Sequence, residues 1–72
     1  MKRYLVKRLA IINGVKDVSY IGQDYSCYDN IRDFRPVQFF TRKNVANAYL
    51  YKYMYGSSNC KVLDIKIIEV NA

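Results

Sequence analysis

The sequence predicts a single α+β domain over residues 1–72, with the element order ββ(β)αβ and one helix covering one face of the sheet. Three patterns lead to this fold class. An Asn-Gly pair separates two apolar runs near the N-terminus, a helical period follows Thr41, and an alternating apolar pattern runs from Cys60 to Val70. A period of 3.6 residues is typical of a helix, and alternation is typical of a half-buried strand.

A β-hairpin is expected over residues 3–12 and 15–21, with Asn13-Gly14 as its turn. Both central positions of a type I′ turn need a positive φ, which Asn and Gly tolerate best. The predicted register contains the pairs Ile12–Val15, Leu9–Val18 and Lys7–Tyr20. We expect an inward face with Leu5, Leu9, Ile11, Val18 and Tyr20, and a solvated face with Arg8, Ala10, Asp17 and Ser19.

Residues 22–36 are rich in turn-forming residues, so we expect irregular structure there, with one helical turn at residues 29–33. Three aromatic residues give this segment enough apolar bulk to pack against the sheet: Tyr25, Tyr28 and Phe34. A short strand is then expected over residues 37–40.

A helix is expected over residues 42–55, with Thr41 as N-cap and Gly56 as the glycine that ends it. Its apolar stripe consists of Val45, Ala46, Tyr49, Leu50 and Tyr53. The alternative is a strand, because tyrosines occupy every second position from Tyr49 to Tyr55, and a strand would place all four rings on one face. After residues 56–59, a strand over residues 60–70 would direct Leu63, Ile65 and Ile67 inward.

The composition argues against catalysis and against bound metals or cofactors. The chain has no histidine, two cysteines, three isolated glycines and no catalytic carboxylate pair, so the usual general bases, zinc sites and phosphate-binding loops are missing. We therefore expect a non-enzyme without cofactors. No apolar run is long enough to span a membrane, so a cytoplasmic protein is expected. Cys27 and Cys60 are expected to be free buried thiols, with a disulfide between them as the alternative.

The net charge of +6 favours an anionic partner. Residues 1–16 and 35–61 contain lysines and arginines but no acidic residue. Tyrosine and arginine are enriched at binding hot spots, so a contact surface is expected where exposed tyrosines lie near basic residues. The predicted partner-binding residues are Lys43, Asn44, Asn47, Tyr51, Lys52 and Tyr55 on the helix, and Lys2, Arg3 and Lys7 on the first strand.

The layout resembles a class of short proteins encoded by bacteriophages and mobile elements. The matching positions are Lys2 to Val6, Tyr20, Asp29, Phe39 to Thr41, Val45-Ala46, Tyr49-Leu50 and Ile65 to Val70. Arg35-Pro36 and the additional tyrosines depart from this pattern. The resemblance implies a protein that binds and inhibits or redirects a host protein, such as a polymerase, a nuclease or a defence effector, and it carries over no functional residue.

The sequence thus predicts a binding protein that occludes a surface of a host macromolecule, with an acidic protein as the preferred partner. Two other functions stay open at this point. One is a small basic nucleic-acid-binding protein, in which lysines hold phosphates and tyrosines stack on bases. The other is a structural protein that acts as a homodimer or larger homo-oligomer.

Overall fold

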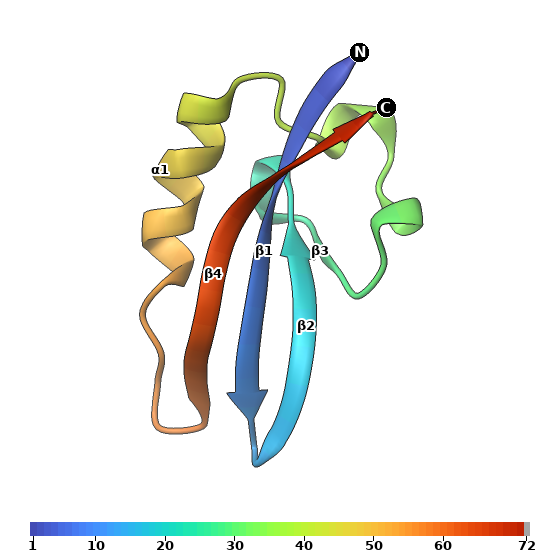
Figure 1. The fold of residues 1–72 in the computed structure, drawn as a ribbon. Coiled ribbons are helices and arrows are strands. Elements are labelled where there is room, and N and C mark those ends of the chain that lie inside the picture. The colour runs from blue at the N-terminus through green and yellow to red at the C-terminus, as the bar shows by residue number, and fades with distance from the viewer. Residues whose placement is uncertain (72) are drawn as a thin grey trace.

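The protein has one helix and a four-stranded antiparallel sheet, as a computed structural model that describes residues 1–71 shows (Figure 1). The α+β class is the one expected from the sequence. The strands run in the spatial order β3-β2-β1-β4. The elements are β1 (Lys2–Ile12), β2 (Val15–Ile21), β3 (Cys27–Tyr28), α1 (Lys43–Tyr53) and β4 (Cys60–Asn71).

The N-terminal hairpin has the turn and the register that the sequence predicts. Asn13 and Gly14 adopt φ angles of 51° and 82°, as the two central residues of a type I′ turn do. The three expected pairs are confirmed: Ile12–Val15, Leu9–Val18 and Lys7–Tyr20.

Strand β4 returns antiparallel to β1 along its whole length and contains a β-bulge. Leu9 pairs with Asp64 whereas Ala10 pairs with Val62, so Leu63 is the extra residue. A bulge interrupts the alternation of side chains between the two faces. Leu63 is 43% exposed, and the expectation that it faces inward is wrong for this reason.

Helix α1 contacts β1 and β4, and it lies beside β4 in Figure 1. The core on this side consists of Val6, Ile21, Phe40 and Ala46. Tyr49, Leu50 and Tyr53 of the predicted stripe pack against this core, whereas Val45 is exposed. The rings of Phe40 and Tyr49 meet edge to face, with centroids 4.8 Å apart.

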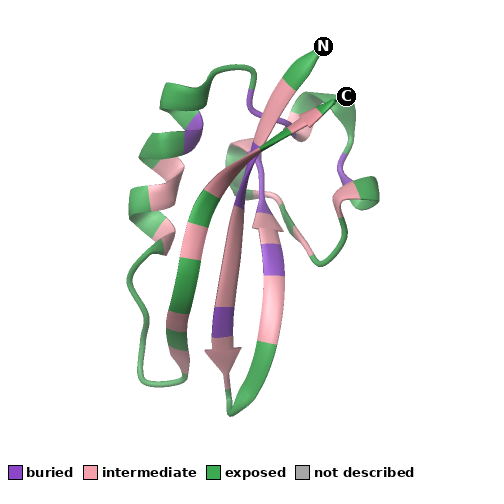
Figure 2. Cartoon of the chain, viewed as in Figure 1, coloured by how far each residue is buried: buried purple, intermediate pink, exposed green. Residues whose placement is uncertain are grey.

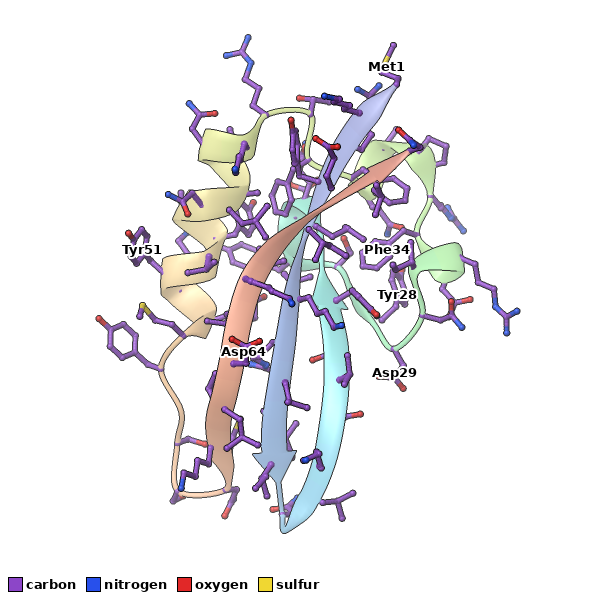
Figure 3. The ribbon with its side chains drawn as sticks, in the orientation of Figure 1. Met1, Tyr28, Asp29, Phe34, Tyr51 and Asp64 are labelled. Atoms are coloured by element: carbon purple, nitrogen blue, oxygen red, sulfur yellow. The ribbon has the colours of Figure 1, made fainter. Side chains whose placement is uncertain are left out.

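The segment between β3 and α1 covers part of the opposite face. Phe34 and Phe39 are buried there against Leu5 of β1. Tyr28 meets Phe34 edge to face at a centroid distance of 4.8 Å, and Figure 3 shows these two side chains side by side. The expectation that the aromatic residues of this segment pack against the sheet is confirmed for Tyr28 and Phe34.

The two faces of the hairpin are used differently from what the sequence predicts. The face that was expected to be solvated lies on the helix side, where Ala10 and Ser19 are buried and Arg8 is half-buried (Figure 2). Alternation alone misassigned this face, because a guanidinium can be covered by an aromatic ring instead of by water.

The ends of the helix also differ from the expectation. Arg42 occupies the N-cap position without a side-chain hydrogen bond, so Thr41 is not the cap. The helix ends at Tyr53, three residues before Gly56. Gly56 has no positive φ and is required for another reason, since a Cβ there would collide with the Cys60 carbonyl oxygen.

The predicted third strand at residues 37–40 is wrong. Pro36–Gln38 form a 3₁₀ turn instead, and only Phe40 makes a bridge, to Tyr4. Proline fixes φ near −65° and lacks an N–H donor, which suits the first position of a turn better than a strand. The expected helical turn exists as a 3₁₀ turn over Ile31–Asp33.

Both cysteines are free thiols, as expected. Cys60 is half-buried, but Cys27 is exposed at the edge of the sheet, so its expected burial is wrong. No helix within residues 1–71 has the length and apolar character needed to cross a membrane.

Candidate functional site

The outer helix face carries most of the predicted helical contact residues. It consists of Lys43, Asn44, Asn47 and Tyr51, all exposed. Tyr51 points away from the sheet in Figure 3 and is 59% exposed, and Tyr55, just beyond the helix, is 78% exposed. The structure therefore brings these predicted residues together on one side of the molecule.

Lys52 belongs to a different environment from the other predicted helical residues. Its Nζ donates a hydrogen bond to the Tyr25 hydroxyl at 2.6 Å and lies over the Tyr25 and Tyr49 rings, 5.1 Å and 5.5 Å from their centroids. The hydrogen bond to Tyr25 raises the pKa of Lys52 above its ordinary value. This ammonium already has partners within the chain.

Tyr25 anchors the loop after β2 to the helix. Its ring centroid lies 5.0 Å from that of Tyr49 and 6.2 Å from that of Tyr53. Asp24 and Tyr25 both have left-handed φ angles, 59° and 62°, a conformation that is unfavourable for a bulky side chain. The aromatic contacts hold Tyr25 in this conformation.

Arg8 completes this aromatic cluster from the sheet. Its guanidinium carbon lies 5.7 Å from the centroid of the Tyr53 ring, within the range of a cation–π contact. Burial raises the pKa of the Tyr53 phenol, and the neighbouring Cys27 and Tyr25 raise it further, while Arg8 lowers it. Arg8 of β1 and the exposed Lys52 of α1 thus both have aromatic partners on this side of the molecule, and the buried Nε of Arg8 makes no hydrogen bond within residues 1–71.

The three predicted residues on β1 do not form one surface. Lys2 lies on the helix side, because it alternates with Tyr4 and Val6, and its Nζ is 3.9 Å from Glu69 Oε1. Arg3 and Lys7 lie on the opposite face with Leu5. The structure therefore places Lys2 on one face of the sheet and Arg3 and Lys7 on the other.

A second surface emerges where the Phe34 segment stops covering the sheet. The pairing register places eight side chains on this part of the face, here called the open sheet face: Lys7, Leu9 and Ile11 of β1, Lys16 and Val18 of β2, and Lys61, Asp64 and Lys66 of β4. In Figure 1 the turns of the Phe34 segment lie beside one end of the sheet only, and the hairpin end extends beyond them.

The cations of the open sheet face lack intramolecular partners. Lys7 lies directly opposite Lys66, and Ile11 lies between Lys16 and Lys61. Within residues 1–71 the single salt bridge is the one between Lys2 and Glu69. Like charges directly opposite each other destabilise a sheet, so this arrangement costs stability in the isolated protein.

Sequence reasoning identified Lys7 but missed the other three lysines of this surface. The hairpin register places Lys16 on the face of Ile11, but Lys61 and Lys66 join that face only through the pairing of β4 with β1. The alternating pattern of β4 predicts that Lys66 lies on the same face as Asp64. The same pattern places Lys61 on the wrong face, because the bulge at Leu63 interrupts it.

Neither a cavity nor a group of three or more potential metal-ligating side chains occurs within the described residues 1–71. No family model, curated protein sequence or solved structure matches this chain.

Proposed function

We propose that the protein is a non-enzymatic binding protein whose open sheet face docks on an acidic protein surface with an apolar centre. The observation that carries this proposal is the unpaired set of four lysines, with Lys7 directly opposite Lys66, around a strip of aliphatic side chains. An acidic partner would relieve the repulsion between these cations, and its apolar centre would cover Leu9, Ile11 and Val18.

The chemistry of the open sheet face favours an acidic protein over a nucleic acid. Binding to single strands relies on exposed aromatic rings on which bases stack. The tyrosine nearest to this surface, Tyr20, already packs against the cluster of Leu5, Phe34 and Phe39. The accessible centre is aliphatic, which fits the apolar part of a protein interface.

On this proposal the protein acts by occlusion. Electrostatic attraction between the lysines and an acidic surface would accelerate association, and the contact itself would block that surface for other partners. Such action matches the host-directed inhibition that the resemblance to phage-encoded proteins implies. The outer helix face stays a predicted second contact surface.

A titration against a model partner tests the proposal. The probe is a labelled helical peptide with one leucine face bordered by glutamates, measured by fluorescence anisotropy at about 150 mM salt, where screening acts over roughly 8 Å. Polyglutamate and single-stranded DNA are the comparison ligands. We expect the amphipathic peptide to bind more tightly than either of them.

Two variants with the same change of charge locate the binding surface. The double variant Lys7→Glu with Lys16→Glu alters the open sheet face, and Arg32→Glu with Arg42→Glu alters exposed residues outside both candidate surfaces. The first should weaken peptide binding by at least about tenfold, or 1.4 kcal/mol, and the second by much less. Equal losses would show that only net charge matters, and preferential binding of DNA would favour the nucleic-acid function.

A further inference from the structure

The outer edge of β4 is a long row of unpaired backbone groups. β4 is the last strand in the sheet, extends over Cys60–Asn71 and contains neither proline nor glycine. The strand at the opposite end, β3, has only two residues. Because an edge strand leaves every second N–H and C=O without a partner, β4 is a template for a further strand.

No other segment of residues 1–71 pairs with this edge beyond Cys60. Apart from the ladder with β1, the backbone hydrogen bonds of β4 are those between Cys60 and Ser57 in the preceding turn. Figure 1 shows β4 crossing in front of β1, with α1 on one side of it and the turns of the Phe34 segment on the other. Asp64 lies at the middle of the strand in Figure 3.

We propose that β4 pairs in antiparallel orientation with β4 of a second copy of this chain, about a two-fold axis at Ile65. In this register Asp64 lies opposite Lys66 of the second copy, and the symmetry repeats this pair. Asp64 and Lys66 share one face of the sheet, because they pair with Leu9 and Lys7 of β1. Opposite charges that face each other across two strands stabilise the pairing.

The charges select this register over its two neighbours. Two identical antiparallel strands are related by a two-fold axis perpendicular to the sheet. Because the same patch contributes from both copies, one residue must lie directly opposite itself at this axis. An axis at Asp64 would place two carboxylates opposite each other, and an axis at Lys66 would place two ammonium groups together. Of these three axes, only the one at Ile65 places each carboxylate opposite an ammonium group.

The same register gives an exposed lysine of β4 an acidic neighbour. Lys66 would lie between Lys7 of its own chain and a carboxylate of the second copy, which offsets the repulsion between the two lysines. The pairing gives one of the four lysines of the open sheet face, Lys66, an acidic partner, and it leaves Lys7, Lys16 and Lys61 uncovered on the combined sheet.

Charge exchange tests the pairing. Sedimentation equilibrium at roughly 10 and 300 µM protein, at low salt, should show dimers of the wild-type chain that dissociate on dilution. Asp64→Lys alone and Lys66→Asp alone should each weaken dimerisation by at least about tenfold. The double variant with both changes should restore it, and an equimolar mixture of the two single variants should form heterodimers.

Arg32→Asp is the control, because it reverses one charge at an exposed position of the Ile31–Asp33 turn, which contributes no residue to the β4 ladder. It should leave the dimer unchanged. Circular dichroism confirms that every variant is folded. A bulge and a lysine in an edge strand are also devices that prevent pairing, and that role predicts a monomer. A wild-type monomer at both concentrations, or a folded double variant that does not recover dimerisation, would overturn the proposal.

Discussion

The cations on the two sides of the sheet differ in whether they have partners within the chain. On the helix side, Arg8 lies against the Tyr53 ring and Lys52 against Tyr25 and Tyr49. On the open sheet face, Lys7 and Lys66 lie opposite each other without a partner. The helix side is therefore arranged for stability, and the open sheet face retains charge that an outside partner can neutralise.

The largest difference between the faces should appear when their central apolar side chains are truncated. Phe40→Ala removes a fully buried ring from the helix side and should lower the free energy of unfolding by about 3–5 kcal/mol. Leu9→Ala on the open sheet face should cost less than about 2 kcal/mol, because the side chain is only half-buried. Urea denaturation measures both values. Equal losses would contradict the division into a stabilising and a binding face.

Raising the pH into the alkaline range should destabilise the protein through two groups on the helix side. Burial raises the pKa of Tyr53 above 10.0, and the hydrogen bond to Tyr25 raises that of Lys52 above 10.5. The folded state thus favours the protonated forms of both groups. Their contribution to the free energy of unfolding is complete at pH values below the pKa of the unfolded chain, and it is lost as the pH rises through the pKa of the folded protein. The free energy of unfolding should fall above about pH 10.

Tyr53→Phe should make this alkaline decrease smaller, because it removes the phenol whose ionisation burial opposes. Tyr51→Phe is the matched control, since Tyr51 is exposed on the outer helix face. Denaturant titrations at pH values on both sides of 10 measure the effect. A decrease that is the same in wild type and Tyr53→Phe would rule out Tyr53 as its source.

The smallest effect should be a gain of stability on the open sheet face. Lys7→Gln removes one of two cations that lie directly opposite each other, and should raise the free energy of unfolding by about 0.2–1 kcal/mol. The same change should weaken binding of the acidic amphipathic peptide. Lys43→Gln, at an exposed position at the start of α1, should leave stability within about 0.5 kcal/mol of wild type. A loss of stability in Lys7→Gln would show that Lys7 contributes to the fold.

Local patterns predicted the elements better than they predicted the faces. The Asn13-Gly14 turn fixes the hairpin register by itself, and the period from Ala46 to Tyr53 identifies the helix. The helix packs on the side of Val6 and Ile21, and there Tyr53 also covers Arg8, a residue far from it in the chain. Alternation assigns a charged position to solvent and therefore predicted the wrong face.

The candidate site depended on the same long-range information. Lys66 becomes the neighbour of Lys7 only after β4 pairs with β1 in a specific register. The bulge at Leu63 changes that register in the middle of the strand, and alternation does not reveal it. The outer helix face could be predicted because all of its residues come from one helix, whereas the open sheet face is assembled from three strands.

The most direct test of the central claim is an NMR titration of the wild-type protein with the leucine- and glutamate-containing peptide. Backbone amide shifts report which residues the peptide contacts. Shifts concentrated at the open sheet face, around Leu9, Val18 and Lys66, with α1 unchanged, are the predicted result. Shifts concentrated at Asn47, Tyr51 and the rest of the outer helix face would contradict the claim that the open sheet face is the binding surface.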